Sequence, residues 1–151
     1  MTTDHRTLAL TSPPATPHPG GAGRVTESGY QPGVCNIGPE EIARRRRAGH
    51  VGLVATAAVL ALLIALGAPP LARLVLFLPA AGAAIGYLQA RFRFCAGFAS
   101  RGVYNFGALG RTSSVDDPTT AARDRSMALR LALASAAIGA VVAIVTVLLP
   151  L

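Results

Sequence analysis

The sequence predicts an all-α integral membrane protein with three transmembrane helices. The chain has 151 residues, of which 52% are hydrophobic and 14% are charged, and its mean hydropathy is +0.48. A soluble domain of this size carries about a quarter charged residues. Apolar runs at about 51–68, 71–90 and 131–150 are long enough to cross a bilayer. These observations exclude an ordinary soluble enzyme, and the length allows a single domain.

The first 34 residues predict a disordered cytoplasmic tail. Four prolines between residues 13 and 19 alternate with small residues, and no apolar period runs through the segment. Such a stretch buries too little surface to offset its ordering entropy. Its apolar patch at 8–10 is too short for a signal peptide. We therefore expect three parts: the tail at 1–34, a membrane-inserted helical hairpin with flanking motifs at 35–110, and a linker with the third span at 111–151.

A helix start precedes the first span. Gly38 or Asn36 can serve as its N-cap, and Pro39 suits the first helical position, where its missing N–H is not needed. Glutamates 40 and 41 favour the positive end of the helix, and each stands four residues before an arginine. The run 51–68 has no charge and no polar face, which excludes an amphipathic surface helix.

The second span, 71–90, is less apolar than the first. Arg73 lies near its end, where we expect the long side chain to reach the headgroups. Pro79 is expected to kink the helix and to free a carbonyl near its middle.

The third span, 131–150, carries no charge. Asp117 before Pro118 provides a cap and a first-turn proline, so we expect this helix to begin near Pro118.

The arginines predict the topology. Every arginine except Arg73 precedes the first span or lies between the second and third. The positive-inside rule then places the N-terminus and residues 91–130 in the cytoplasm and the C-terminus outside. All 14 basic residues are arginine and none is lysine, which indicates a high-GC bacterial coding bias. We therefore expect the protein in the bacterial inner membrane.

Basic and aromatic side chains gather at the predicted cytoplasmic interface, where both residue types favour headgroup depth. The segment 91–107 alternates them most densely, and an alternative is that it forms a surface loop that packs against 35–41 and builds a site. The residues expected to contact lipid are Arg44, Arg45, Arg46, Arg47, Arg91, Phe92, Arg93 and Phe94.

Two cysteines, Cys35 and Cys95, fall at the predicted cytoplasmic ends of the hairpin, which should lie close together. One interpretation is a thiol pair that carries sulfur or senses redox state. The other is that both are small apolar residues in the packing. No spacing typical of a metal site is present, since His50 with both cysteines still leaves a ligand missing. We therefore expect no metal and no cofactor.

The function that we expect follows from a helix-packing pattern and from the lack of catalytic motifs. Gly82 and Gly86 form a GxxxG pattern that favours close helix approach. The spans hold no acid, histidine or lysine for a proton relay, and the chain has no nucleotide loop or nucleophile elbow. We expect a non-enzymatic protein that acts through lipids, a protein partner or a homo-oligomer, without nucleic acid. The alternative is a thiol site at Cys35 and Cys95.

Residues 35–107 carry a resemblance to a known family. The run C-N-I-G-P-E-E-I-A-R-R-R from Cys35 and the run F-C-A-G-F-x-x-x-G-V-Y-N-F from Phe94 flank an apolar hairpin. This arrangement resembles the small bacterial two-span transmembrane domain found alone, or fused to rhodanese in inner-membrane sulfurtransferases. The resemblance implies a link to sulfur or thiol handling. The chain departs from the family by its third span and by a single cysteine after the second.

Overall fold

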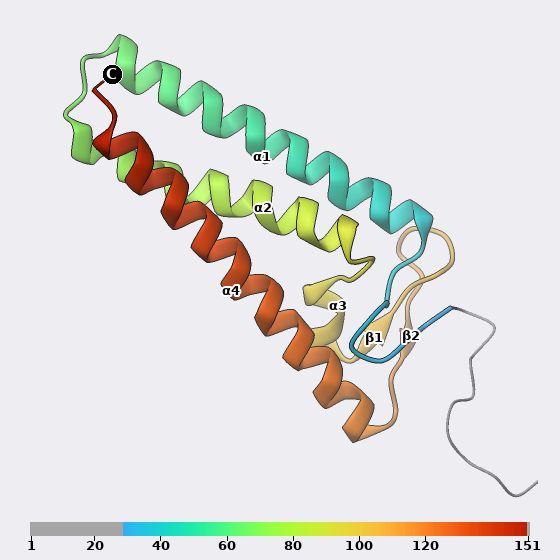
Figure 1. The fold of residues 1–151 in the computed structure, drawn as a ribbon. Helices are drawn as coiled ribbons and strands as arrows, with labels where there is room; N and C mark the ends of the chain where they lie inside the picture. The colour runs from blue at the N-terminus through green and yellow to red at the C-terminus, as the bar shows by residue number, and fades with distance from the viewer. Residues whose placement is uncertain (1–28, 151) are drawn as a thin grey trace, which may run out of the picture.

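The computed structural model describes residues 29–150 of the chain, which fold around three long helices (Figure 1). A short 3-10 helix, η1, leads directly into the second long helix, and a small helix and a two-stranded antiparallel pairing lie between the second and third. The elements are α1 (Pro39–Ala65), η1 (Pro70–Leu76), α2 (Phe77–Arg91), α3 (Ala96–Arg101), β1 (Val103–Tyr104), β2 (Ser113–Ser114) and α4 (Pro118–Leu148).

Three helical segments are long and apolar enough to cross a membrane. They are Pro39–Ala65, the joined η1 and α2 at Pro70–Arg91, and Pro118–Leu148, with mean hydropathies of 2.1, 1.7 and 2.6 over their most apolar windows. The predicted runs at 51–68, 71–90 and 131–150 lie within or overlap these helices. The expectation of three apolar helices is therefore confirmed, and the helices fit a multi-pass membrane protein.

Helix α2 lies between α1 and α4 and packs against both (Figure 1). Glycines allow this approach. A Cβ built on Gly86 of α2 would stand 2.5 Å from the backbone N of Gly49, and one on Gly52 would stand 2.7 Å from the backbone N of Ala83. A Cβ on Gly139 of α4 would meet the Phe77 carbonyl at 2.8 Å. The two contacts of α2 with its neighbours are therefore made backbone against backbone.

Gly82, the other member of the predicted GxxxG pair, has a different position. A Cβ built on it would meet no atom within 4 Å, and the residue is exposed. Among the residues that the structure describes, Gly86 alone of this pair makes a close helix contact.

One expectation for the second span is wrong. Arg73 does not extend to the headgroups: it is 3% exposed, and its guanidinium donates to the Thr146 and Leu149 carbonyls at 2.8 and 2.9 Å. The unpaired carbonyls at the end of α4 attract this cation because they form the negative end of the helix. Pro79 lies in the first turn of α2, so the change from 3-10 helix to α-helix falls beside it, near the middle of the joined span.

Both predicted helix starts are confirmed. Gly38 is the N-cap of α1 with Pro39 at the first position. Asp117 is the N-cap of α4, and its carboxylate accepts hydrogen bonds from the Thr119 hydroxyl and from the Thr120 backbone N at 2.6 and 2.8 Å. These bonds, the Thr119 hydroxyl first, hold the pKa of Asp117 at about 2, below its ordinary 3.8.

The two expected glutamate–arginine pairs of α1 are formed only in part. Glu41 and Arg45 pair at 3.4 Å as expected. Arg44 instead reaches Glu41 at 3.6 Å, since the carboxylate of Glu40 accepts a hydrogen bond from the Leu109 backbone N.

Candidate functional site

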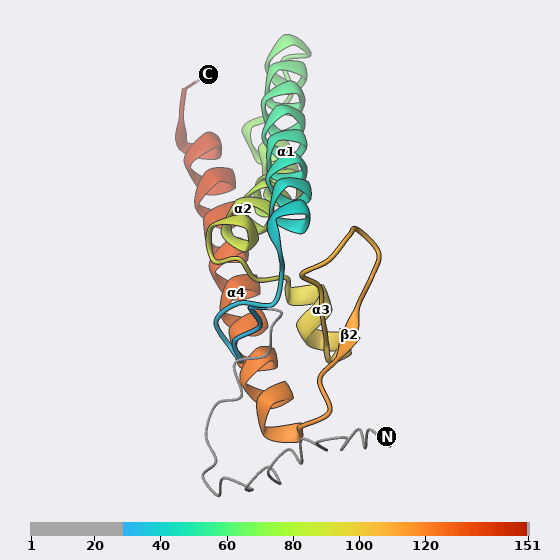
Figure 2. The same ribbon diagram turned by 90° about the vertical axis from the view of Figure 1, so that its right-hand side faces the viewer.

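A small folded unit sits at the end of the bundle where α1 and α4 begin (Figures 1 and 2). It consists of residues 29–38 and 92–117, and we call it the end module. It contains α3, β1 and β2. Residues 29–34, which the sequence assigned to the tail, belong to this module and pack against α4. The remainder of the predicted disordered tail, residues 1–28, lies outside the described residues.

Asn36 joins the two segments of the module. Its side chain is fully buried and bonds both backbone groups of one residue: Cys95 N donates to Oδ1 at 2.6 Å, and Nδ2 donates to the Cys95 carbonyl at 3.1 Å. The backbone of Ile37 also forms a parallel bridge with Asn105. The segment 91–107 therefore packs against the segment before α1, as the surface-loop alternative for this segment expected.

Asp124 of α4 holds the start of the module. This carboxylate is fully buried, and it accepts hydrogen bonds from the Tyr30 hydroxyl at 2.8 Å and from the Gly33 backbone N at 2.6 Å. Burial, and then the bond to Asp124, raise the pKa of Tyr30 above its ordinary value. The Tyr30 ring stacks on Tyr104 with 4.5 Å between centroids. The segment before α1 is thus tied to α4 and to β1.

The two cysteines are both free and occupy different environments within the module. Cys95 is 1% exposed and packs with Ile37 and Phe98 in an apolar cluster. Cys35 is partly exposed, and its Sγ lies 3.9 Å from the Ile37 carbonyl. The bonds of Asn36 to Cys95 bring the two segments together, so Cys35 stands next in sequence to a residue that contacts Cys95. One thiol lies in the core and the other near the surface.

Two of the expected lipid-contacting residues are buried or engaged inside the protein. Phe94 is 0% exposed and packs with Ala99 and Leu131, because the chain turns inward after α2. Arg45 pairs with Glu41, and its guanidinium lies 5.7 Å from the centre of the Phe98 ring. The other expected lipid-contacting residues are exposed at this end of the molecule: Arg44, Arg46, Arg47, Arg91, Phe92 and Arg93.

Positive charge is gathered at the end of the bundle that carries the module. Every described arginine except Arg73 lies in the module, in the N-terminal halves of α1 and α4, or at the end of α2. Arg73 lies at the opposite end, where η1 meets the end of α4 (Figure 1). The separation of charge that the sequence predicted is therefore also a separation in space.

The buried polar side chains of the module are used to hold its backbone. Asn105, for example, accepts from the Gly107 backbone N at 2.9 Å and donates to the Ala108 carbonyl at 3.1 Å. In the same way, Asn36 bonds the backbone of Cys95, and Asp124 of α4 bonds the backbone N of Gly33. Within residues 29–150, no three His, Cys, Asp or Glu side chains group to hold a metal ion.

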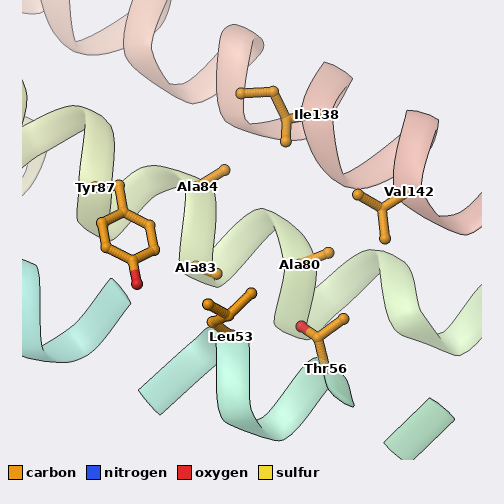
Figure 3. Close-up of a pocket in the computed structure, with 8 residues that line it drawn as sticks. All are labelled: Leu53, Thr56, Ala80, Ala83, Ala84, Tyr87, Ile138 and Val142. Atoms are coloured by element: carbon orange, nitrogen blue, oxygen red, sulfur yellow. The ribbon is translucent and has the colours of Figure 1, made fainter. Parts of the chain in front are cut away.

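An apolar recess of about 220 Å³ lies among the three long helices (Figure 3). Its only polar groups are Thr56, whose hydroxyl bonds the Gly52 carbonyl at 2.8 Å, and Tyr87, whose hydroxyl lies 2.6 Å from His50 Nδ1. The recess therefore presents a hydrocarbon-like surface within the spans. The feature of the sequence that could have predicted this recess is the run of small residues in α2.

The chain matches no protein-family model, no curated protein and no solved structure.

Proposed function

We propose that this chain is a non-enzymatic multi-pass protein of the bacterial inner membrane, which acts by binding lipids or a protein partner through its end module. In this proposal the module and the N-terminus face the cytoplasm and the C-terminus faces out. The observation that carries it is the division of polar groups within the module. The buried polar side chains form hydrogen bonds with the backbone, whereas the exposed arginines lie at the surface, where a ligand can reach them.

This division favours binding over catalysis. A catalytic site needs a nucleophile, acid or base placed where a substrate can reach it. Asn36, Asp124 and Glu41 are all 1% exposed or less. An exposed cationic surface beside apolar spans instead suits anionic lipid or an acidic partner surface.

Site-specific photocrosslinking of the full chain in native membranes tests the proposal. A photoreactive residue replaces Arg101, which is exposed on α3, or Val141, which is 59% exposed in the apolar part of α4. We expect discrete adducts at position 101 and diffuse lipid adducts at position 141. Identical patterns at the two positions would argue against a binding role for the module.

A thiol site is the second candidate, because Cys35 stands next in sequence to Asn36, which contacts Cys95. In this reading Cys35 is the reacting thiol, since Cys95 is buried. Persulfide or disulfide formation on Cys35 in cells, abolished by Cys35→Ser, would favour it over the binding role. A Cys35 that stays reduced and unmodified would favour the binding role.

A further inference from the structure

An apolar groove and a polar cavity meet on one face of α4. The groove has a volume of about 400 Å³ and is lined by Leu88, Phe92, Met127, Arg130, Leu131 and Ala134. The cavity has a volume of about 260 Å³ and is lined by Pro32, Gly33, Arg123, Ser126, Met127 and Arg130. Because Met127 and Arg130 line both, the two hollows form one continuous surface. The groove alone falls within the range of about 300–1,000 Å³ that is typical of ligand sites.

Two arginines of α4 point to an anionic ligand in the cavity. Arg123, Ser126 and Arg130 stand three and four residues apart and so share a helix face. Among residues 29–150, neither arginine makes a hydrogen bond or an ion pair. The nearest acid in sequence, Asp124, gives its two oxygens to Tyr30 and Gly33 instead. Among residues 29–150, the cavity lining contains no carboxylate that would compensate the charge of its two arginines.

The same bonds shape the cavity wall. Gly33 has a φ of +71° and lies against α4, where a Cβ on it would stand 3.4 Å from Arg123 Cβ. Asp124 fixes this turn through the Gly33 backbone N. The part of the cavity wall that Gly33 forms beside Arg123 is therefore held in place by the protein itself.

The position along α4 matches the boundary between a lipid headgroup and its chains. Arg130 is the last charged residue of α4, and the helix is uncharged from Leu131 onward. Ala134 lies about 6 Å further along the axis, at about 1.5 Å per residue. A ligand that filled both hollows would place its anion beside Arg123 and Arg130 and its apolar part beside Leu131 and Ala134.

We propose that this face of α4 binds an anionic phospholipid, with its phosphate in the polar cavity and one acyl chain in the apolar groove. The inference rests on the proposed function and names the lipid class. Guanidinium groups suit phosphate because they offer several donors in a fixed plane. A zwitterionic lipid fits less well, since no acidic side chain lines the cavity to receive its ammonium group.

Lipid binding to the full chain in a neutral detergent tests the proposal, measured by native mass spectrometry. The probes are phosphatidylglycerol, phosphatidylcholine with the same chains, and glycerol 3-phosphate as the headgroup without chains. We expect one phosphatidylglycerol to bind at least about tenfold more tightly than phosphatidylcholine. Glycerol 3-phosphate should not displace it, because it cannot use the apolar groove.

Paired variants separate the two halves of the site. Arg123→Gln with Arg130→Gln should weaken phosphatidylglycerol binding about 30-fold, since each arginine near an anionic lipid is worth about fivefold. The control is Arg125→Gln, which removes an exposed charge that lines neither hollow. Ala134→Phe should fill the groove and weaken binding, whereas Ala132→Phe, on another face, should not.

Three results would overturn the lipid site: equal affinity for the two lipids, equal effects of Arg125→Gln and the double substitution, or displacement by glycerol 3-phosphate. The last would identify a free phosphate ligand. If the lipid site fails while discrete adducts persist at position 101, the proposed binding role of the module stands. Failure of both experiments would remove both proposals.

Discussion

Replacing Gly86 with alanine tests the contact between α1 and α2 most sharply. The added Cβ would stand 2.5 Å from Gly49 N, 2.8 Å from Gly49 Cα and 2.9 Å from the Arg45 carbonyl oxygen. All three are backbone atoms, so no side chain can rotate to relieve the clash and the helices must move apart. Overpacking of this kind typically costs about 1–3 kcal/mol. We expect the free energy of unfolding to fall by that amount.

Gly82→Ala is the matched control, one helical turn away on the same helix. Its Cβ would meet nothing within 4 Å, so no clash arises. Alanine is also the better helix former, by about 1 kcal/mol in water. We expect the free energy of unfolding to stay the same or to rise slightly.

The thiol of Cys95 provides the assay, because it is 1% exposed in the folded protein. In a Cys35→Ser background, the rate of alkylation in mixed micelles reports the unfolded fraction as denaturing detergent is added. The midpoint should move to lower denaturant for Gly86→Ala and should not for Gly82→Ala. Equal shifts for the two variants would refute the arrangement of α1 against α2.

Three further perturbations address the ends of the bundle. Asn36→Leu leaves the buried N–H of Cys95 without a partner, whereas the Cys95 carbonyl still accepts from the Phe98 and Ala99 backbone N. The free energy of unfolding should fall by about 1–3 kcal/mol in the same alkylation assay, and an unchanged midpoint would contradict the role of Asn36. Because the folded pKa of Asp117 is depressed to about 2 from 3.8, its contribution is present above pH 3.8 and is lost as the pH falls towards 2. The protection factor of the Thr120 amide, which is corrected for the intrinsic pH dependence of hydrogen exchange, should therefore fall over that interval, and Asp117→Asn should remove this fall. Arg73→Met should loosen the end of α4, seen as faster exchange near Thr146, whereas a protected end would show that the two carbonyl bonds are dispensable.

The helices could be predicted from the sequence because their signals are local. Long apolar runs identify a span without knowledge of its neighbours. Asp117 before Pro118 marks a helix start by capping chemistry alone, and the structure has the start at that position. Segregation of arginine along the chain also became segregation in space, since helices that follow each other through a bundle alternate direction.

The failures share a different cause, which is contact between segments far apart in sequence. Arg73 was expected to extend outward, but it bonds carbonyls more than 70 residues away, at Thr146 and Leu149. Phe94 stands in a run of aromatic and basic residues typical of an interface, yet it is buried against Leu131. No local pattern reports such pairings.

The end module shows the same limit. The sequence suggested that segment 91–107 packs near the start of α1, but it offered Asn36 only as a possible N-cap and Asp124 no role. Asn36 bonds the backbone of Cys95, and Asp124 bonds the Gly33 backbone N beside the Tyr30 hydroxyl. Any residue type supplies such backbone groups, so these partners leave no trace in the sequence. The polar residues inside an otherwise apolar motif, such as Asn36 in the C-N-I-G run, were the available signal.

Sided labelling of thiols in native membranes shows on which face of the membrane the end module lies. Cys35 should react with an impermeant maleimide from the cytoplasmic face alone, Pro69→Cys should react from the opposite face, and Cys95 should react after denaturation. Labelling of Cys35 and position 69 from one face would contradict the hairpin across the membrane. Labelling of Cys95 in intact membranes as fast as Cys35 would contradict the folded end module.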